Sequence, residues 1–112
     1  MLAASFKPDR RAATRYPVDY PLLGERPRRG DIALRILNIS TRGVMARVDG
    51  GLAPGERLTL GLPVIGRIEA HVLWTDGRRA GLQFERIVRL GDFTRMFVEM
   101  QPRRRFRGRD HG

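Results

Sequence analysis

The feature that most constrains the fold of this 112-residue chain is a two-residue alternation of side chains, repeated in short segments. Such alternation is typical of half-buried β-strands. Turn residues separate six segments, and Pro17 and Pro21 should confine the first of them to a sheet edge. Short strands joined by compact turns predict a mainly β fold, a closed or nearly closed six-stranded antiparallel barrel. The expected strands are 17–23, 32–37, 44–49, 57–62, 66–74 and 80–84.

The period changes after the sixth segment. Apolar residues now recur at spacings of three and four, which predicts a C-terminal α-helix; they are Ile87, Leu90, Phe93, Met96, Phe97 and Met100. Pro102 should stop this helix. We therefore expect a flexible N-terminal arm at 1–16, a barrel with its helix at 17–100, and a disordered Arg-rich tail at 101–112.

The charge lies mainly at the two ends of the chain. The net charge is +10, yet residues 31–100 carry ten cations and eight anions. This distribution predicts basic arms on a nearly neutral body, not a body that binds duplex DNA over a whole face.

Cysteine is absent, which excludes disulfides and thiolate chemistry. His71 and His111 do not suggest a metal site, and no carboxylate pair or nucleophile–base arrangement suggests an enzyme. Without a membrane-spanning run, we expect a cytoplasmic protein that needs no cofactor.

Two stretches are candidates for a binding site. Asn38-Ile39-Ser40-Thr41-Arg42-Gly43 separates two predicted strands, and its Asn, Ser and Gly predict a tight turn in which Gly43 supplies a positive φ. Taken alone, it is most simply a hairpin. Upstream, Arg10-Arg11-Ala12-Ala13-Thr14-Arg15 presents guanidinium groups suited to phosphate oxygens and to the guanine O6/N7 edge. Taken alone, it is most simply solvated charge.

Together the two stretches resemble the double signature of the PilZ domain family. Arg11-x-x-x-Arg15 matches its R-x-x-x-R motif, and Asn38-x-Ser40-x-x-Gly43 matches its [D/N]-x-S-x-x-G motif. The segments 72–74 and 80–84 are similar to the family's final hairpin, so the resemblance covers about residues 10–100. It implies a PilZ-like split barrel that binds the bacterial second messenger cyclic di-GMP.

The resemblance also implies roles for the motif residues. Arg11 and Arg15 would hold phosphates and guanine edges, Asn38 and Ser40 would meet the guanine N1/N2 edge, and Gly43 would keep the turn close beneath the ligand. We expect the ligand to order the arm against the barrel and so change a surface read by an unknown downstream protein.

Two further residues have alternative interpretations. Arg10 could stack on a second ligand molecule, which favours two ligands per site over one. Trp74, the lone tryptophan, is expected in the barrel core, with a ring bordering the guanine site as the alternative. The competing functions are a small basic β-barrel that binds nucleic acid and a PilZ-type adaptor that no longer uses the nucleotide. The protein could be a monomer or a homodimer.

Overall fold

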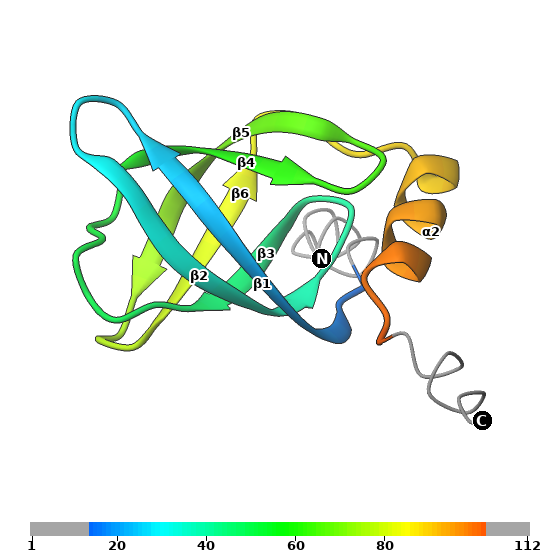
Figure 1. The fold of residues 1–112 in the computed structure, drawn as a ribbon, viewed down its shortest axis with the longest axis horizontal. Coiled ribbons are helices and arrows are strands. Elements are labelled where there is room, and N and C mark those ends of the chain that lie inside the picture. Colours follow the sequence, from blue (N-terminus) through cyan, green and yellow to red (C-terminus); the bar gives the residue numbers. More distant parts are fainter. Residues whose placement is uncertain (1–13, 103–112) are drawn as a thin grey trace, which may run out of the picture.

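The computed structural model describes residues 14–102, which form a closed antiparallel barrel with a helix at one end (Figure 1). The strands follow the order β1-β2-β3-β6-β5-β4 around the barrel. This confirms the fold class predicted from the alternation. The elements are β1 (Tyr16–Arg26), β2 (Gly30–Ile39), β3 (Gly43–Arg47), β4 (Arg57–Leu62), β5 (Gly66–Thr75), β6 (Arg79–Phe84) and α2 (Leu90–Glu99).

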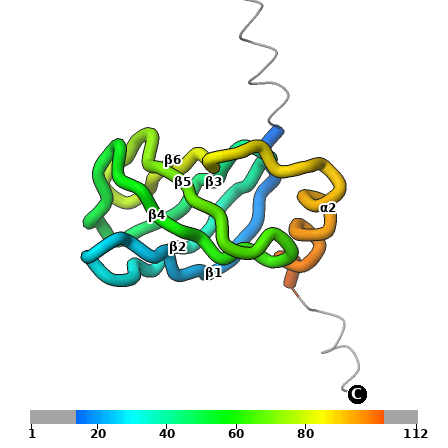
Figure 2. The backbone as a smooth tube through the Cα atoms, turned by 90° about the horizontal axis from the view of Figure 1, so that it is seen from above, coloured from blue at the N-terminus to red at the C-terminus, as the bar shows by residue number. Residues whose placement is uncertain are grey.

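The core fills the inside of the barrel and continues under the helix. Every strand from β2 to β6 sends alternate apolar side chains inward, and α2 adds Phe93 and Met96. Figure 2 shows the helix packed across one end of the barrel. Full burial of one such side chain contributes about 1.5–3 kcal/mol, so this closure is a large part of the fold's stability. The largest fully buried apolar residues are Ile36, Ile39, Val44, Leu58, Leu60, Ile68, Val72, Leu82, Val88 and Met96.

The first strand is longer than the sequence predicts, and it is not a simple edge strand. It pairs with β2 along its length and also with β4, where Gly24 lies opposite Leu60. Pro17 and Pro21 precede that second pairing, so the missing amide hydrogens interrupt no ladder to β4. The edge prediction is therefore wrong for the strand as a whole, because its second half closes the barrel.

The helix begins later than the apolar spacing predicts. Arg89 is its extended N-cap residue, so Ile87 lies before the helix and is 56% exposed. Val88 points inward instead, and its amide donates to the carbonyl of Thr41 at 2.9 Å. Leu90 starts the helix but is 72% exposed. The chain must turn from β6 onto the barrel end, and this connection breaks the helical spacing before residue 90.

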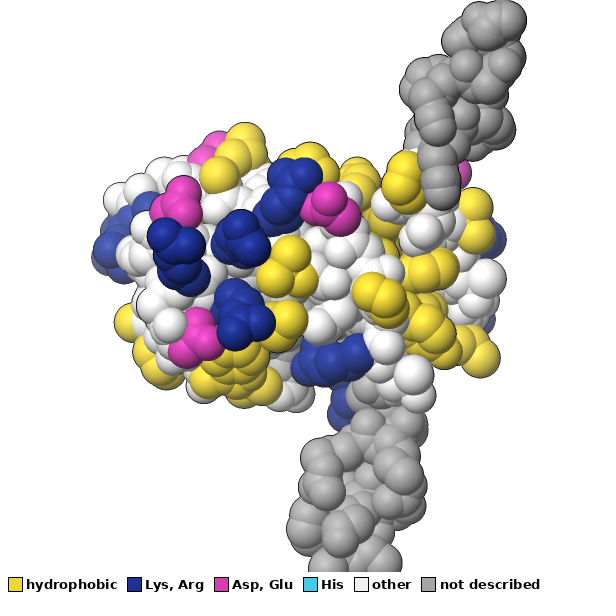
Figure 3. Space-filling view, turned by 90° about the horizontal axis from the view of Figure 1, so that it is seen from below, with side chains coloured by type: hydrophobic (Ala, Val, Ile, Leu, Met, Phe, Trp, Pro, Cys, Tyr) yellow, Lys and Arg dark blue, Asp and Glu magenta, His cyan; other side chains and the backbone are white. Residues whose placement is uncertain are grey.

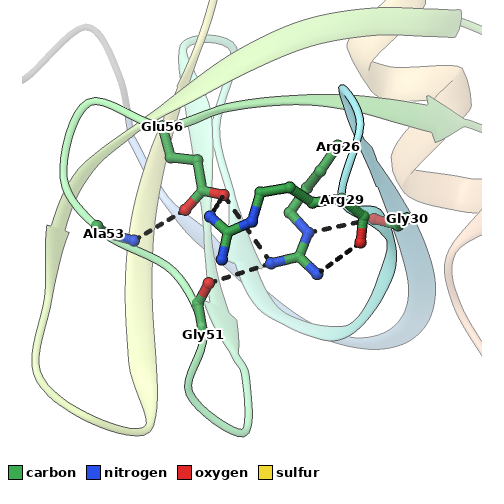
Figure 4. Close-up of polar contacts among 6 residues, drawn as sticks. All are labelled: Arg26, Arg29, Gly30, Gly51, Ala53 and Glu56. Carbon is green, nitrogen blue, oxygen red and sulfur yellow. Dashed lines mark hydrogen bonds and ion pairs between the residues drawn. The ribbon is translucent and has the colours of Figure 1, made fainter.

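A polar network holds the opposite end of the barrel (Figure 4). The Arg26 guanidinium donates to the carbonyl of Arg29 at 3.3 Å and to that of Gly51 at 3.1 Å. Glu56 accepts from the Arg29 guanidinium at 2.8 Å and from the Ala53 amide at 3.0 Å. The side chains of Arg26 and Glu56 are both only 14% exposed. These contacts join the β1–β2 turn to the loop before β4.

Within residues 14–102, no helix is long and apolar enough to cross a membrane.

Candidate functional site

The turn between β2 and β3 is shorter than the sequence predicts. Asn38 and Ile39 belong to β2 and Gly43 to β3, which leaves only residues 40–42 outside the strands. Ser40 is 1% exposed, and its hydroxyl accepts from the amides of Arg42 at 3.0 Å and Gly43 at 3.2 Å. The hydroxyl thus supplies partners for two turn amides that would otherwise be unsatisfied. In the structure it faces the turn, not the solvent.

The same turn is braced from the C-terminal side. The carbonyl of Arg42 accepts from the amide of Phe84, at 2.8 Å, and that of Thr41 accepts from Val88. These two hydrogen bonds fix the turn against the end of β6 and the connection to α2.

Gly43 is required for a reason other than the predicted one. Its φ is not positive, so the expected conformational role is wrong. A Cβ at this position would lie 2.1 Å from the carbonyl oxygen of Leu82 on β6 and 3.1 Å from the Cα of Gln83. The glycine lets β3 and β6 approach each other closely beside the turn.

The two sequence motifs meet at a hydrogen bond. Tyr16 pairs with Ile39 and Pro17 with Asn38, so Arg15 directly precedes the paired part of β1 and its side chain reaches back to Asn38. Arg15 Nη1 donates to Asn38 Oδ1 at 2.8 Å. Asn38 points outward because a register shift follows Ile36 in the β2–β3 pairing. The other two motif arginines, at positions 10 and 11, lie outside the described residues.

Trp74 belongs to the outer surface, which corrects its predicted place in the core. A register shift between Val72 and Trp74 moves the indole to the outer face, where it is 40% exposed. It covers Gly81, where a Cβ would lie 2.2 Å from the indole Nε1. Since Asn38 pairs with Met45 and Met45 with Gly81, the outer face carries a row that runs from Arg15 and Asn38 to Trp74. We call it the site row: Arg15, Asn38, Met45, Gly81 and Trp74.

Sequence reasoning missed an aromatic contact between the site and the helix. The Tyr16 ring lies 5.7 Å from Phe93 and 5.7 Å from Phe97, centroid to centroid. Phe93 and Phe97 are themselves 6.2 Å apart. Aromatic pairs at these separations contribute about 0.5–1.5 kcal/mol beyond their buried area. The only signal in the sequence was a tyrosine directly after the second motif arginine.

A second group of titratable side chains lies away from the site row. A cavity of about 170 Å³ is bordered by His71, Glu69 and Glu85, on β5 and the segment after β6. No group of three or more potential ligands among residues 14–102 is placed to hold a metal ion. On the barrel surface, a hydrogen bond from Arg67 to the Glu25 carboxylate, with the attraction between their charges, raises the pKa of Arg67.

The fold and the site row define a small β-barrel domain that presents an arginine, an asparagine and a rigid turn on one outer face. The family model of the PilZ domain matches residues 9–93 of the chain. The chain therefore belongs to the PilZ domain family, a family of cyclic di-GMP-binding adaptors. Comparison with curated proteins gives no match.

Proposed function

We propose that this protein is a non-catalytic receptor for cyclic di-GMP and that the ligand binds on the site row beside the β2–β3 turn. One observation carries the proposal: Arg15 of the first motif donates to Asn38 of the second at 2.8 Å. Two stretches that are 23 residues apart in sequence thus meet at one point on the barrel surface. Family membership supports the identity of the ligand.

The chemistry of the site suits a guanine dinucleotide. The Arg15 guanidinium can bind a phosphate oxygen or the O6/N7 edge of guanine, and its plane can stack on a base. The Asn38 amide can exchange hydrogen bonds with the N1/N2 edge. Ser40 and Gly43 contribute by shaping the turn, since the hydroxyl is bonded within it and the glycine packs on β6. Trp74 offers an exposed ring at the far end of the row.

The ligand orders the arm, residues 1–16, against the barrel and thereby changes a surface read by a partner protein. Arg11 would close over the ligand together with Arg15. Tyr16 supports this mechanism because it directly follows Arg15 and packs on Phe93 and Phe97 of α2. A displacement of Arg15 toward a ligand therefore pulls on a side chain that contacts the helix. The surface of α2 is the part of the molecule most directly coupled to ligand binding.

Arg10 adds a stacking position, so two ligand molecules bind per site. Replacing it with leucine removes the planar charge and should reduce the stoichiometry from two to one without abolishing binding. Identical stoichiometry in both proteins refutes this assignment.

Titration calorimetry with cyclic di-GMP tests the proposal. The wild type should bind, and Arg15→Ala should bind at least about tenfold more weakly, because a hydrogen bond to a charged group is worth about 1.5–3 kcal/mol. Cyclic di-AMP is the matched control ligand, since adenine lacks the O6 acceptor and the N1/N2 donors. Absence of cyclic di-GMP binding by a folded wild type would overturn the proposal.

The alternative of a nucleic-acid-binding barrel makes a different prediction. Single-strand binders combine a basic groove with several stacking aromatics, and their affinity falls steeply with salt. In the described part of the chain, the large exposed aromatics are Tyr16 and Trp74, and Tyr16 is engaged with α2. Binding of single-stranded oligonucleotides with a steep salt dependence, in place of cyclic di-GMP binding, would favour the alternative.

A further inference from the structure

A row of three arginines lies next to the site row on the outer face of the barrel. Arg35 on β2 pairs with Arg47 on β3, and Arg47 pairs with Arg79 on β6. Like charges placed directly opposite each other across strands destabilise a sheet. This arrangement therefore needs nearby anions to offset it.

Carboxylates neutralise the two outer members of the row but not the middle one. Arg35 forms an ion pair with Asp19 at 2.6 Å, and Arg79 lies 3.8 Å from Asp76. Across residues 14–102, the exposed guanidinium of Arg47 has neither an ion-pair nor a hydrogen-bond partner. Arg47 is thus the position in the row where an added anion would be most favoured.

The position of Arg47 relative to the site follows from the strand register. It lies two residues beyond Met45 on β3, so both side chains point outward. Met45 in turn pairs with Asn38, whose Nδ2 lies 3.9 Å from the Met45 sulfur. With about 7 Å between alternate residues and about 5 Å between strands, the backbone of Arg47 is roughly 9 Å from that of Asn38. An extended arginine side chain can span most of this distance.

The surface beside Arg47 is hollowed. Arg35 and Arg47 border a cavity of about 270 Å³ that is also lined by Val48 and Asp49. Asp49 follows Arg47 on the side away from Met45, so it does not lie between Arg47 and the site row. In Figure 1 the end of β3 and the β5–β6 hairpin lie along the lower edge of the barrel. Basic side chains, interspersed with acidic ones, gather on the face seen from below (Figure 3).

From this geometry we infer that Arg47 forms a second anion-binding position of the same site and holds the second phosphate of the cyclic dinucleotide. The inference rests on the proposed function. A cyclic dinucleotide carries two phosphates on opposite sides of its ring, so one guanidinium at the turn end of the site row (Arg15) and a second in the neighbouring row (Arg47) match its charge distribution. Arg15 binds at the turn side and Arg47 at the side of the arginine row. The contact with Arg47 fixes the orientation of the ligand, which then lies over Met45.

The test compares Arg47→Met with Arg57→Met by titration calorimetry with cyclic di-GMP. Arg57→Met is the matched control because this substitution removes the same charge from β4, the strand that lies across the barrel from β3. Arg47→Met should weaken binding by about tenfold or more, the usual loss for a hydrogen bond to a charged group, while Arg57→Met leaves affinity unchanged. Arg47→Lys should fall between the wild type and Arg47→Met, because an ammonium cannot form the bidentate contact. A urea melt of each variant confirms folding.

The remaining outcomes separate the inference from the proposed function. Wild-type affinity in Arg47→Met overturns the second phosphate position and leaves the receptor function intact. Equal weakening by the two methionine variants means that only long-range charge matters, which also overturns it. A folded wild type that does not bind cyclic di-GMP overturns the receptor function first, and the inference with it.

Discussion

Replacing Gly43 with alanine should destabilise the fold itself, because the structure makes this motif glycine a packing residue. The added Cβ would lie 2.1 Å from the Leu82 carbonyl oxygen, whereas real Cβ contacts essentially never fall below 3.0 Å. Strands β3 and β6 must therefore separate by about 0.9 Å at this point, the difference between the two distances. The adjacent hydrogen bond from the Phe84 amide to the Arg42 carbonyl, at 2.8 Å, would be strained or lost. Overpacking of this kind typically costs about 1–3 kcal/mol.

Urea denaturation followed by circular dichroism measures this cost. Gly61→Ala is the matched control: Gly61 also lies in a strand, its φ is not positive, and a Cβ there would meet nothing within 4 Å. The control should be neutral or more stable by up to about 1 kcal/mol, because alanine restricts the unfolded chain. Gly43→Ala should also lower the Tm by about 4–8 °C for each kcal/mol lost. Equal stability of Gly43→Ala and the wild type would refute the packing role. The glycine would then be explained by its position beneath the ligand.

Three further substitutions test other parts of the site. Ser40→Ala removes the acceptor of two turn amides and should lower the free energy of unfolding by about 1–3 kcal/mol; an unchanged urea midpoint would contradict this. Gly81→Ala should displace the indole of Trp74 and shift its fluorescence emission, whereas an unchanged spectrum would show that the ring does not lie over the glycine. Tyr16→Leu should increase amide hydrogen exchange in α2, because the ring contact with Phe93 is lost; exchange at the wild-type rate would argue against coupling between the arm and the helix.

The sequence by itself determined the strand content and the two motifs of the candidate site. Alternation between adjacent residues is a local property of extended backbone, so the strands could be placed to within a few residues. The end of the helix followed from Pro102, which lies just beyond Glu99. The two motifs could be recognised because they depend on residue types at fixed short spacings. The structure adds that Arg15 and Asn38 lie in contact.

The tertiary structure alone decided which face several residues occupy and why the glycines are needed. Trp74 follows the inward positions of its strand in sequence, yet a register shift against β6 places it outside. A bulge depends on the partner strand, and local periodicity contains no information about that partner. Gly43 is required by the backbone of Leu82, which lies almost 40 residues away in the sequence. Gly81 is required by the indole of Trp74, seven residues away. The row formed by Arg35, Arg47 and Arg79 likewise exists only because the barrel pairs β3 with both β2 and β6.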